Sequence, residues 1–293
     1  MDINPTQEGL YNVRAAIPDH LDVFTRWRKW SDEYKAEHPA VQIDLPYGEG
    51  PDETLDYFPA LPTNAQGGPL LLLIHGGYWQ AMDKADTSFA ARELNTAGIN
   101  VAVVNHTLCP HTTLEEIDSQ IGRAIIWLWC TAQELGADPE QLFIAGHSAG
   151  GHLAALSMTH DWSRQTVQIP HGIIKGGIAI SGLFDLTALM NTSINIKVGL
   201  NDQAAKTLSP INHRPVSDAP LILAVGSEES IGFHGQMETF ARAWGSVGSK
   251  IETMVLPGCH HFGAFEALAL KDSPLLAATL ALMAQNRTSF PVR

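Results

Sequence analysis

The pentapeptide Gly146-His147-Ser148-Ala149-Gly150 constrains the fold of this chain more than any other segment. An apolar run, residues 141–145, precedes it, and a helix-like stretch, residues 151–156, follows it. A serine between a strand and a helix in a G-x-S-x-G turn stands at the carboxyl edge of a parallel sheet. Small residues flank the serine because the turn leaves no room for neighbouring Cβ atoms. Ser148 is therefore a candidate nucleophile.

A second glycine-rich turn lies one strand–helix–strand interval ahead of this serine. The apolar run 70–74 ends in His75-Gly76-Gly77-Tyr78-Trp79. In this arrangement, backbone N–H groups of the loop and of the residue after the serine can stabilise a negatively charged oxygen. A plain strand-to-helix turn would explain the glycines but not their position ahead of a serine elbow. We expect an oxyanion hole built from Gly76, Gly77, Tyr78 and Ala149.

Candidate acids and bases follow two further apolar runs. Residues 220–225 lead into Gly226-Ser227-Glu228-Glu229, and residues 251–256 lead into a loop that contains His260 and His261. Groups at the ends of parallel strands gather at one edge of the sheet. The order serine, acid, histidine is the one that follows such an elbow. These patterns leave Glu228 and Glu229 open as the acid and both histidines open as the base, while Asp185 lies one strand too early.

The alternation of buried runs with amphipathic segments predicts an α/β fold. From Leu55 onward, such segments as 114–135 and 237–244 separate the apolar runs, which is typical of a mostly parallel central sheet with helices on both faces. Residues 1–50 are polar and helix-prone, so we expect an N-terminal helical lead-in packed on the core. Residues 51–293 contain no Pro/Gly/Ser linker and are expected to form a single domain.

The composition limits the partners and the compartment. A formal net charge of −13 argues against nucleic acid and anionic membranes as partners. Three cysteines are too few for a disulfide framework, and the N-terminus lacks the pattern of a signal peptide, so we expect a cytoplasmic protein. The sequence leaves the oligomeric state open, a homodimer included.

Together these motifs resemble the arylformamidase (kynurenine formamidase) branch of the α/β-hydrolases and its bacterial esterase-like relatives. Beyond the two glycine-rich turns, the similarity extends to Tyr11-Asn12-Val13-Arg14, Tyr47-Gly48, residues 55–58, Asp83-Lys84, residues 181–186 and His261-Phe262. The family's acid leads a segment acid-Ser-x-x-Phe-x-x-Gln, which residues 229–236 match. The resemblance therefore implies Glu229 as the acid, and its His-Phe pair implies His261 as the base.

The implied activity is that of a serine hydrolase. Ser148, Glu229 and His261 would cleave an N-formyl or N-acyl arylamine amide through an acyl-enzyme intermediate, without a metal or organic cofactor. A carboxylesterase acting on small aryl or short-chain esters is the alternative. A metal-dependent hydrolase and a non-catalytic binding protein are further alternatives, although no H-E-x-x-H motif is present.

The substrate is expected to be a small aryl amide or ester. Four aromatic residues are candidates for the pocket wall, namely Trp79, Trp162, Phe184 and Phe233. Trp79 could equally anchor its own loop, and Asp83 with Lys84 is expected to be a solvated or loop-stabilising pair. The sequence departs from the family at His106-Thr107-Leu108-Cys109-Pro110, where relatives usually carry a Tyr, so we expect an altered wall there.

Overall fold

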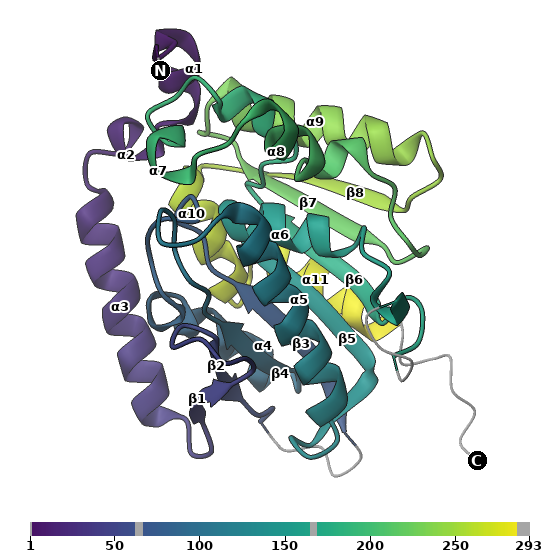
Figure 1. Cartoon of the computed structure of the whole chain (residues 1–293). Helices are drawn as coiled ribbons and strands as arrows, with labels where there is room; N and C mark the ends of the chain where they lie inside the picture. The colour runs from purple at the N-terminus through teal and green to yellow at the C-terminus, as the bar shows by residue number, and fades with distance from the viewer. Residues whose placement is uncertain (1, 62–66, 165–168, 286–293) are drawn as a thin grey trace.

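The computed structural model describes residues 2–61, 67–164 and 169–285. Within them, eight strands form one sheet in the order β1-β2-β4-β3-β5-β6-β7-β8 (Figure 1). The strands are β1 (Gln42–Pro46), β2 (Thr54–Phe58), β3 (Gly68–Ile74), β4 (Asn100–Val104), β5 (Ala137–His147), β6 (Ile174–Ile180), β7 (Leu221–Gly226) and β8 (Ile251–Leu256).

Helices connect these strands. They are α1 (Pro5–Tyr11), α2 (Val13–Ala16), α3 (His20–Glu37), α4 (Ala91–Thr96), α5 (Leu114–Thr131), α6 (Ala149–Ser157), α7 (Asn195–Val198), α8 (Asp202–Thr207), α9 (Ile231–Gly245), α10 (His261–Glu266) and α11 (Pro274–Gln285). Short 3₁₀ turns lie between them, at η1 (Lys84–Asp86), η2 (Ser88–Ala90), η3 (Trp162–Arg164), η4 (Leu186–Leu189), η5 (Pro210–Asn212) and η6 (Ala267–Ala269).

Neighbouring strands are parallel from β4 through β3, β5, β6 and β7 to β8, whereas β2 runs antiparallel to both of its neighbours, β1 and β4. All residues of β3, β4 and β7 are buried. Strands covered on both faces need apolar side chains at every position, which explains their continuous apolar runs. The edge strand β8 is largely exposed. The prediction of a mostly parallel sheet is confirmed.

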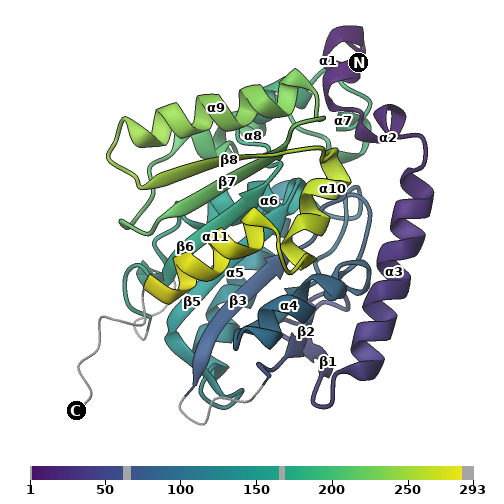
Figure 2. The same ribbon diagram turned by 180° about the vertical axis from the view of Figure 1, so that it is seen from behind.

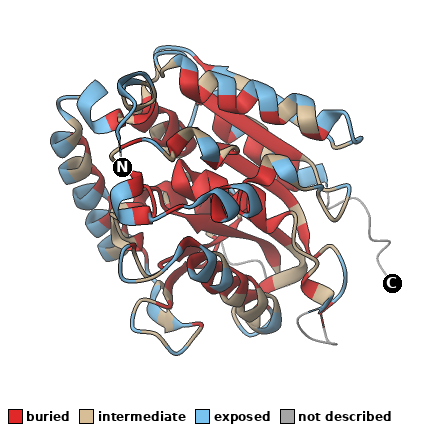
Figure 3. Ribbon diagram, turned by 45° about the horizontal axis from the view of Figure 1, so that its top comes forward, coloured by how far each residue is buried: buried red, intermediate tan, exposed pale blue. Residues whose placement is uncertain are grey.

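Helices cover both faces of the sheet. The helices α5 and α6 lie on one face in Figure 1, and α4 and α11 lie on the other in Figure 2. Figure 3 shows the buried sheet between helices whose outer sides are exposed. Because these strands are parallel, the carboxyl ends of β3, β5, β7 and β8 lie at one edge of the sheet, where the loops after them meet.

The N-terminal segment wraps around one side of the molecule. It is helical only as far as Glu37, because residues 42–46 of the expected lead-in form the first strand of the sheet. On α3, Phe24 lies 5.1 Å from Phe262 and Trp27 lies 5.1 Å from Phe265, measured between ring centroids. These aromatic contacts join α3 to α10, so Phe24 and Trp27 serve packing.

The described residues contain no single helix with the length and hydropathy of a membrane span. Residues 261–269 and α11 pass that test only as a pair, by length and composition, and they are bent by 54° relative to each other.

Candidate active site

Ser148 occupies a strained turn between β5 and α6. Its backbone angles are φ 57° and ψ −115°, a combination that non-glycine residues rarely adopt. A Cβ on Gly146 would lie 2.1 Å from the carbonyl oxygen of Gly150, and a Cβ on Gly150 would lie 2.1 Å from that of Ile74. Both positions therefore require glycine. The Ser148 N–H donates to Ile180 O at 2.8 Å, which ties the turn to β6.

Glu229 is bonded through both carboxylate oxygens. His261 Nδ1 lies 2.6 Å from Oε2, while Ser181 Oγ–H and the Gly226 N–H donate to Oε1 at 2.5 and 2.7 Å. Burial alone would raise the pKa of this carboxyl. The charge of protonated His261 and the three hydrogen bonds outweigh it and hold the pKa of Glu229 below its ordinary value. Glu229 is therefore ionised at neutral pH and orients His261.

The base lies beside the nucleophile. The ring of His147, the residue before Ser148, lies 4.7 Å from the ring of His261. Among the described residues, no hydrogen bond joins Ser148 to His261. Nucleophile–base contacts are often long without substrate and tighten when it binds. The structure thus brings acid and base into contact and places Ser148 next to them.

The oxyanion loop crosses directly over the elbow. A Cβ on Gly76 would lie 3.3 Å from Ser148 Cβ, and Gly77 has φ 103°, where a Cβ would meet the Ala81 carbonyl oxygen at 2.0 Å. Within the part of the chain that the structure describes, the N–H groups of Gly77, Tyr78 and Ala149 have no acceptor. These three donors are available to a developing oxyanion.

A stacked pair of histidines supports this loop from within. His75 and His106 lie 4.6 Å apart at an interplanar angle of 13°, and both are buried. Burial lowers the pKa of both, and with the neighbouring His75 it lowers the pKa of His106 to about 3. Because His106 stacks beneath the loop, the departure from the family at this position changes the support of the oxyanion loop.

Comparison with known proteins identifies the family of this chain. The BD-FAE family model matches residues 57–243. A kynurenine formamidase of Salmo salar is 31% identical over 83% of this chain and 82% of that protein. Esterase LipQ of Mycobacterium tuberculosis is 26% identical over 82% of this chain and 61% of that protein. A Silicibacter sp. TM1040 structure, provisionally assigned as a thioesterase, has 30% identity, a TM-score of 0.79 and coverage of 94% of this chain and 98% of that one.

This chain belongs to the kynurenine formamidase branch of the α/β-hydrolases.

As a member of that branch, the chain is an enzyme of the hydrolase type. The expected fold class and the expected resemblance to this branch are both confirmed. The site residues themselves stay predictions.

The residues that compete with the triad have other roles. His260 Nδ1 accepts hydrogen bonds from the N–H groups of Phe262 and Gly263 and so caps α10, and Glu228 is exposed. Asp185 caps η4 by accepting from Thr187. The described residues contain no cluster of three or more His, Cys, Asp or Glu that could hold a metal ion.

The pair Asp83 and Lys84 is neither solvated nor joined. Lys84 is buried, and its Nζ lies 2.6 Å from the buried Asp56, which also binds Lys35. Asp83 caps η1 and accepts from Asn105. Of the two expected roles, solvated or loop-stabilising, the structure supports the second. Each residue fixes the segment after the oxyanion loop, and Lys84 is not solvated, because a buried ammonium needs its carboxylate partner.

The four aromatic candidates lie in different places. Trp79 is fully buried against His152, with ring centroids 5.0 Å apart, and Phe184 stacks on Phe240 at 4.2 Å. Trp162 lines a separate pocket with Asp118 and Arg123. Phe233 lies 4.6 Å from the ring of His261. The structure therefore brings only Phe233 of these four to the triad.

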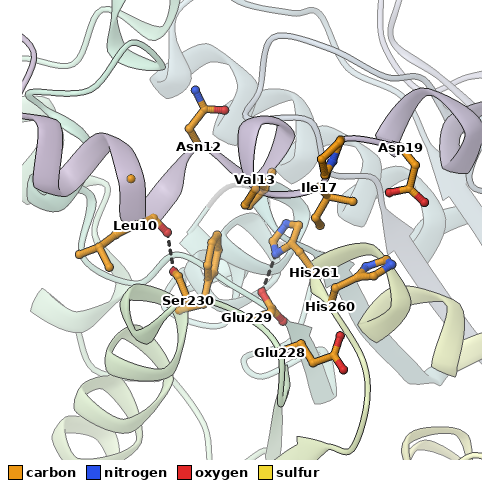
Figure 4. A pocket seen from close by; sticks show the side chains of 14 residues that line it. Leu10, Asn12, Val13, Ile17, Asp19, Glu228, Glu229, Ser230, His260 and His261 are labelled. Carbon is orange, nitrogen blue, oxygen red and sulfur yellow. Dashed lines mark hydrogen bonds and ion pairs between the residues drawn. The ribbon is translucent and has the colours of Figure 1, made fainter.

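A pocket of about 280 Å³ opens beside the acid and base (Figure 4). The N-terminal segment forms one wall, and the loops after β7 and β8 face it, with Glu228, Glu229, His260 and His261. Ser230 Oγ–H donates to Leu10 O, and Tyr78 Oη–H donates to Tyr11 O, so α1 is fastened to both α9 and the oxyanion loop. The lining residues of the N-terminal wall are Gly9, Leu10, Asn12, Val13, Ala16, Ile17, Pro18 and Asp19.

Two contributions were not predicted from the sequence. Ser181, which holds Glu229, entered only as part of a matching segment; its position directly after the buried strand β6 is the signal that could have identified it. The N-terminal wall of the pocket likewise entered only through the matching segment Tyr11-Asn12-Val13-Arg14, and its role in the pocket was not predicted because its partners lie far away along the chain.

Proposed function

We propose that this hydrolase cleaves N-formyl or N-acyl arylamine amides through an acyl-enzyme intermediate formed on Ser148. The observation that carries the proposal is the 2.6 Å contact between Glu229 and His261, placed beside a serine in an elbow conformation. Family membership supports the same chemistry, since the Salmo salar relative is a kynurenine formamidase. The substrate and the compartment, which we take to be the cytoplasm, belong to this proposal.

The reaction begins when Ser148 Oγ attacks the amide carbonyl. His261 takes the hydroxyl proton at Nε2, and Glu229 stabilises the imidazolium through Nδ1–H. The N–H groups of Gly77, Tyr78 and Ala149 bind the oxyanion that develops on the carbonyl oxygen. Each such donor typically contributes about 3 kcal/mol of transition-state stabilisation.

The tetrahedral intermediate then collapses. The C–N bond breaks, and His261 returns its proton to the leaving arylamine, which leaves the acyl group on Ser148. Water enters, gives a proton to His261 and attacks the acyl carbonyl. The second collapse releases the carboxylic acid and restores the serine hydroxyl.

The pocket suits an aryl leaving group. Phe233 and the aliphatic side chains of Leu10, Val13 and Ile17 offer an apolar surface next to His261. A planar ring packs well against such a wall, and a small acyl group needs little additional room. The esterase named among the relatives supports the alternative, a carboxylesterase that uses the same triad.

A substrate panel with matched variants tests the proposal. The purified protein is assayed with N-formyl arylamides and with aryl esters of short acids, and with a serine-directed fluorophosphonate. We expect turnover of the formyl arylamide, labelling at Ser148, and loss of both in Ser148→Ala and His261→Ala. His260→Ala is the control and should keep most of the activity.

Other outcomes would decide between the alternatives. Turnover of esters alone would favour the carboxylesterase, and chelator-sensitive activity that survives Ser148→Ala would contradict a serine mechanism. Absence of both labelling and turnover would point to a binding protein.

A further inference from the structure

His147 is buried at the junction of the three parts of the site. Its Nε2 lies 2.9 Å from the carbonyl oxygen of His261, which ends the loop after β8 (residues 257–261, the base loop) and begins α10. Its ring lies 4.7 Å from the His261 ring, and a Cβ on Gly76 of the oxyanion loop would lie 3.2 Å from its Nδ1. The residue directly after it is Ser148. One side chain thus bonds to the base loop, leaves little room for a side chain at Gly76 of the oxyanion loop and adjoins the nucleophile.

The hydrogen bond fixes the tautomer of this histidine. A carbonyl oxygen can only accept, so His147 carries its proton on Nε2 and donates it to His261. Nδ1 has no partner among the described residues, and Phe265 stacks on the ring at 5.1 Å. A second proton would leave a buried N–H without an acceptor, which is costly.

Neutral His147 is what the neighbouring base requires. Burial, and then the charge of His261, hold the pKa of His147 well below its ordinary value. A cation at this position would repel the imidazolium that forms on His261 during the reaction. The neutral ring can bind the base loop without opposing that charge.

We propose that His147 is a positioning residue of the reaction, whose Nε2–H holds the backbone of His261 against the serine elbow. This hydrogen bond fixes the imidazole of His261 between Glu229 and Ser148. The hydrogen bond to Glu229 alone would leave the imidazole free to rotate about that bond. The inference rests on the proposed serine-hydrolase function and adds to it a residue outside the triad.

His152 offers a matched control. It lies on α6, is fully buried, and its Nε2 also bonds to a backbone carbonyl, Leu208 O, at 2.7 Å. Its carbonyl partner is not on the base loop. Loss of either hydrogen bond should cost similar stability, but only loss of the His147 bond should disturb the base.

The experiment compares His147→Phe, which keeps a ring without a donor, with His147→Gln, which keeps an N–H near Nε2, and with His152→Phe. One readout is the second-order rate of fluorophosphonate labelling at Ser148. The other is the downfield ¹H NMR signal of the proton between His261 Nδ1 and Glu229, recorded on the full-length protein. Thermal unfolding midpoints report how much stability each variant loses.

We expect His147→Phe to slow labelling about tenfold or more, as loss of one buried hydrogen bond in the transition state would, and to broaden or abolish the NMR signal. His147→Gln should restore part of both, and His152→Phe should keep the signal. If His147→Phe does not fold, His147→Asn, whose amide is too short to reach the carbonyl, takes its place.

Two results would overturn the inference. One is a folded His147→Phe or His147→Asn protein with the labelling rate and NMR signal of the wild type. The other is equal loss of signal in His152→Phe, which would mean a general effect of stability. Wild-type protein that resists labelling would contradict the proposed function, while the NMR signal would still test His147.

Discussion

Glu229 shows how a single residue can be specified by three neighbours. Its two carboxylate oxygens accept from His261, Ser181 and the Gly226 N–H, and its side chain has no exposed surface. A buried carboxylate remains charged only when it is hydrogen-bonded in this way. The adjacent Glu228 lies at the surface and has none of these contacts to the base.

Replacement of the two glutamates should therefore have unequal effects. Glu229→Gln removes the charge that stabilises the imidazolium, and we expect kcat to fall by about 10²- to 10⁴-fold. Glu228→Gln is the isosteric control and should leave kcat nearly unchanged. Steady-state kinetics of both variants check this, and an equal or reversed loss would contradict the assignment of the acid.

Ser181→Ala should make the protein less stable in a pH-dependent way. Because the folded pKa of Glu229 is lowered, its contribution to stability is full above the unfolded glutamate pKa of about 4.3 and is lost as the pH falls through the folded value. Loss of the Ser181 hydrogen bond raises the folded pKa. We expect the free energy of unfolding of Ser181→Ala to be about 1.5–3 kcal/mol lower than that of the wild type at pH 7, the usual range for a hydrogen bond to a charged group.

Urea unfolding at a series of pH values measures this deficit. It should shrink as the pH falls below about 4, where Glu229 becomes protonated in the unfolded state and then in the folded state. Ser230→Ala, which removes a neighbouring hydroxyl bound to Leu10 O, is the control and should show a pH-independent loss. A Ser181→Ala deficit that does not vary with pH would contradict the prediction.

Among the elements, α1 and α2 have the clearest effect on the site. They form one wall of the pocket, and their attachment depends on a few polar contacts. Glu8 accepts from the N–H and the hydroxyl of Ser193 at 2.7 and 2.6 Å, and from Asn12. Helices this short have little stability of their own, so these tertiary contacts hold the wall in place.

Removal of the Glu8 anchor should change substrate binding more than chemistry. In Glu8→Ala we expect KM to rise by up to about tenfold, since one or two hydrogen bonds are lost, while kcat changes little. Glu33→Ala on α3 removes the same charge from an exposed site and is the control. Amide hydrogen exchange should show faster exchange in residues 5–16 of Glu8→Ala alone. A fall in kcat with KM unchanged would contradict the role of this wall.

At the scale of the whole molecule, we expect the negative charge to discriminate among substrates. The net charge is −13, and Asp19 and Glu228 line the pocket, whereas none of the described lining residues is Lys or Arg. The field should repel anionic substrates from this entrance.

A pair of aryl acetates that differ by one ring carboxylate tests this effect. We expect a lower kcat/KM for the carboxylated ester, and a difference that narrows as salt rises from about 0.01 M to 1 M, because the screening length falls from about 30 Å to 3 Å. Asp19→Asn should narrow the difference at low salt. A preference for the carboxylated ester would contradict the prediction.

The sequence predicted the centre of the fold better than its periphery. Buried parallel strands such as β3 and β7 are continuous apolar runs, so their loops and the candidate triad could be located. The choice of Glu229 over Glu228 needed the family resemblance, because both lie on one loop. Trp79 and Phe184 could not be assigned to core or pocket, since a buried aromatic and a pocket aromatic have the same local pattern.

The contact between α3 and α10 has a consequence for biosynthesis. Arg26 and Trp27 both donate to Glu266, more than two hundred positions further along the chain, and His261 lies on the same helix as that glutamate. During translation, α3 can pack against Phe58 and Phe89 early, whereas its contacts with α10 form only after Glu266 has left the ribosome. We expect the nascent chain to lack the proposed base until His261, which lies just before Glu266, has also emerged, so hydrolysis should require this segment of the chain.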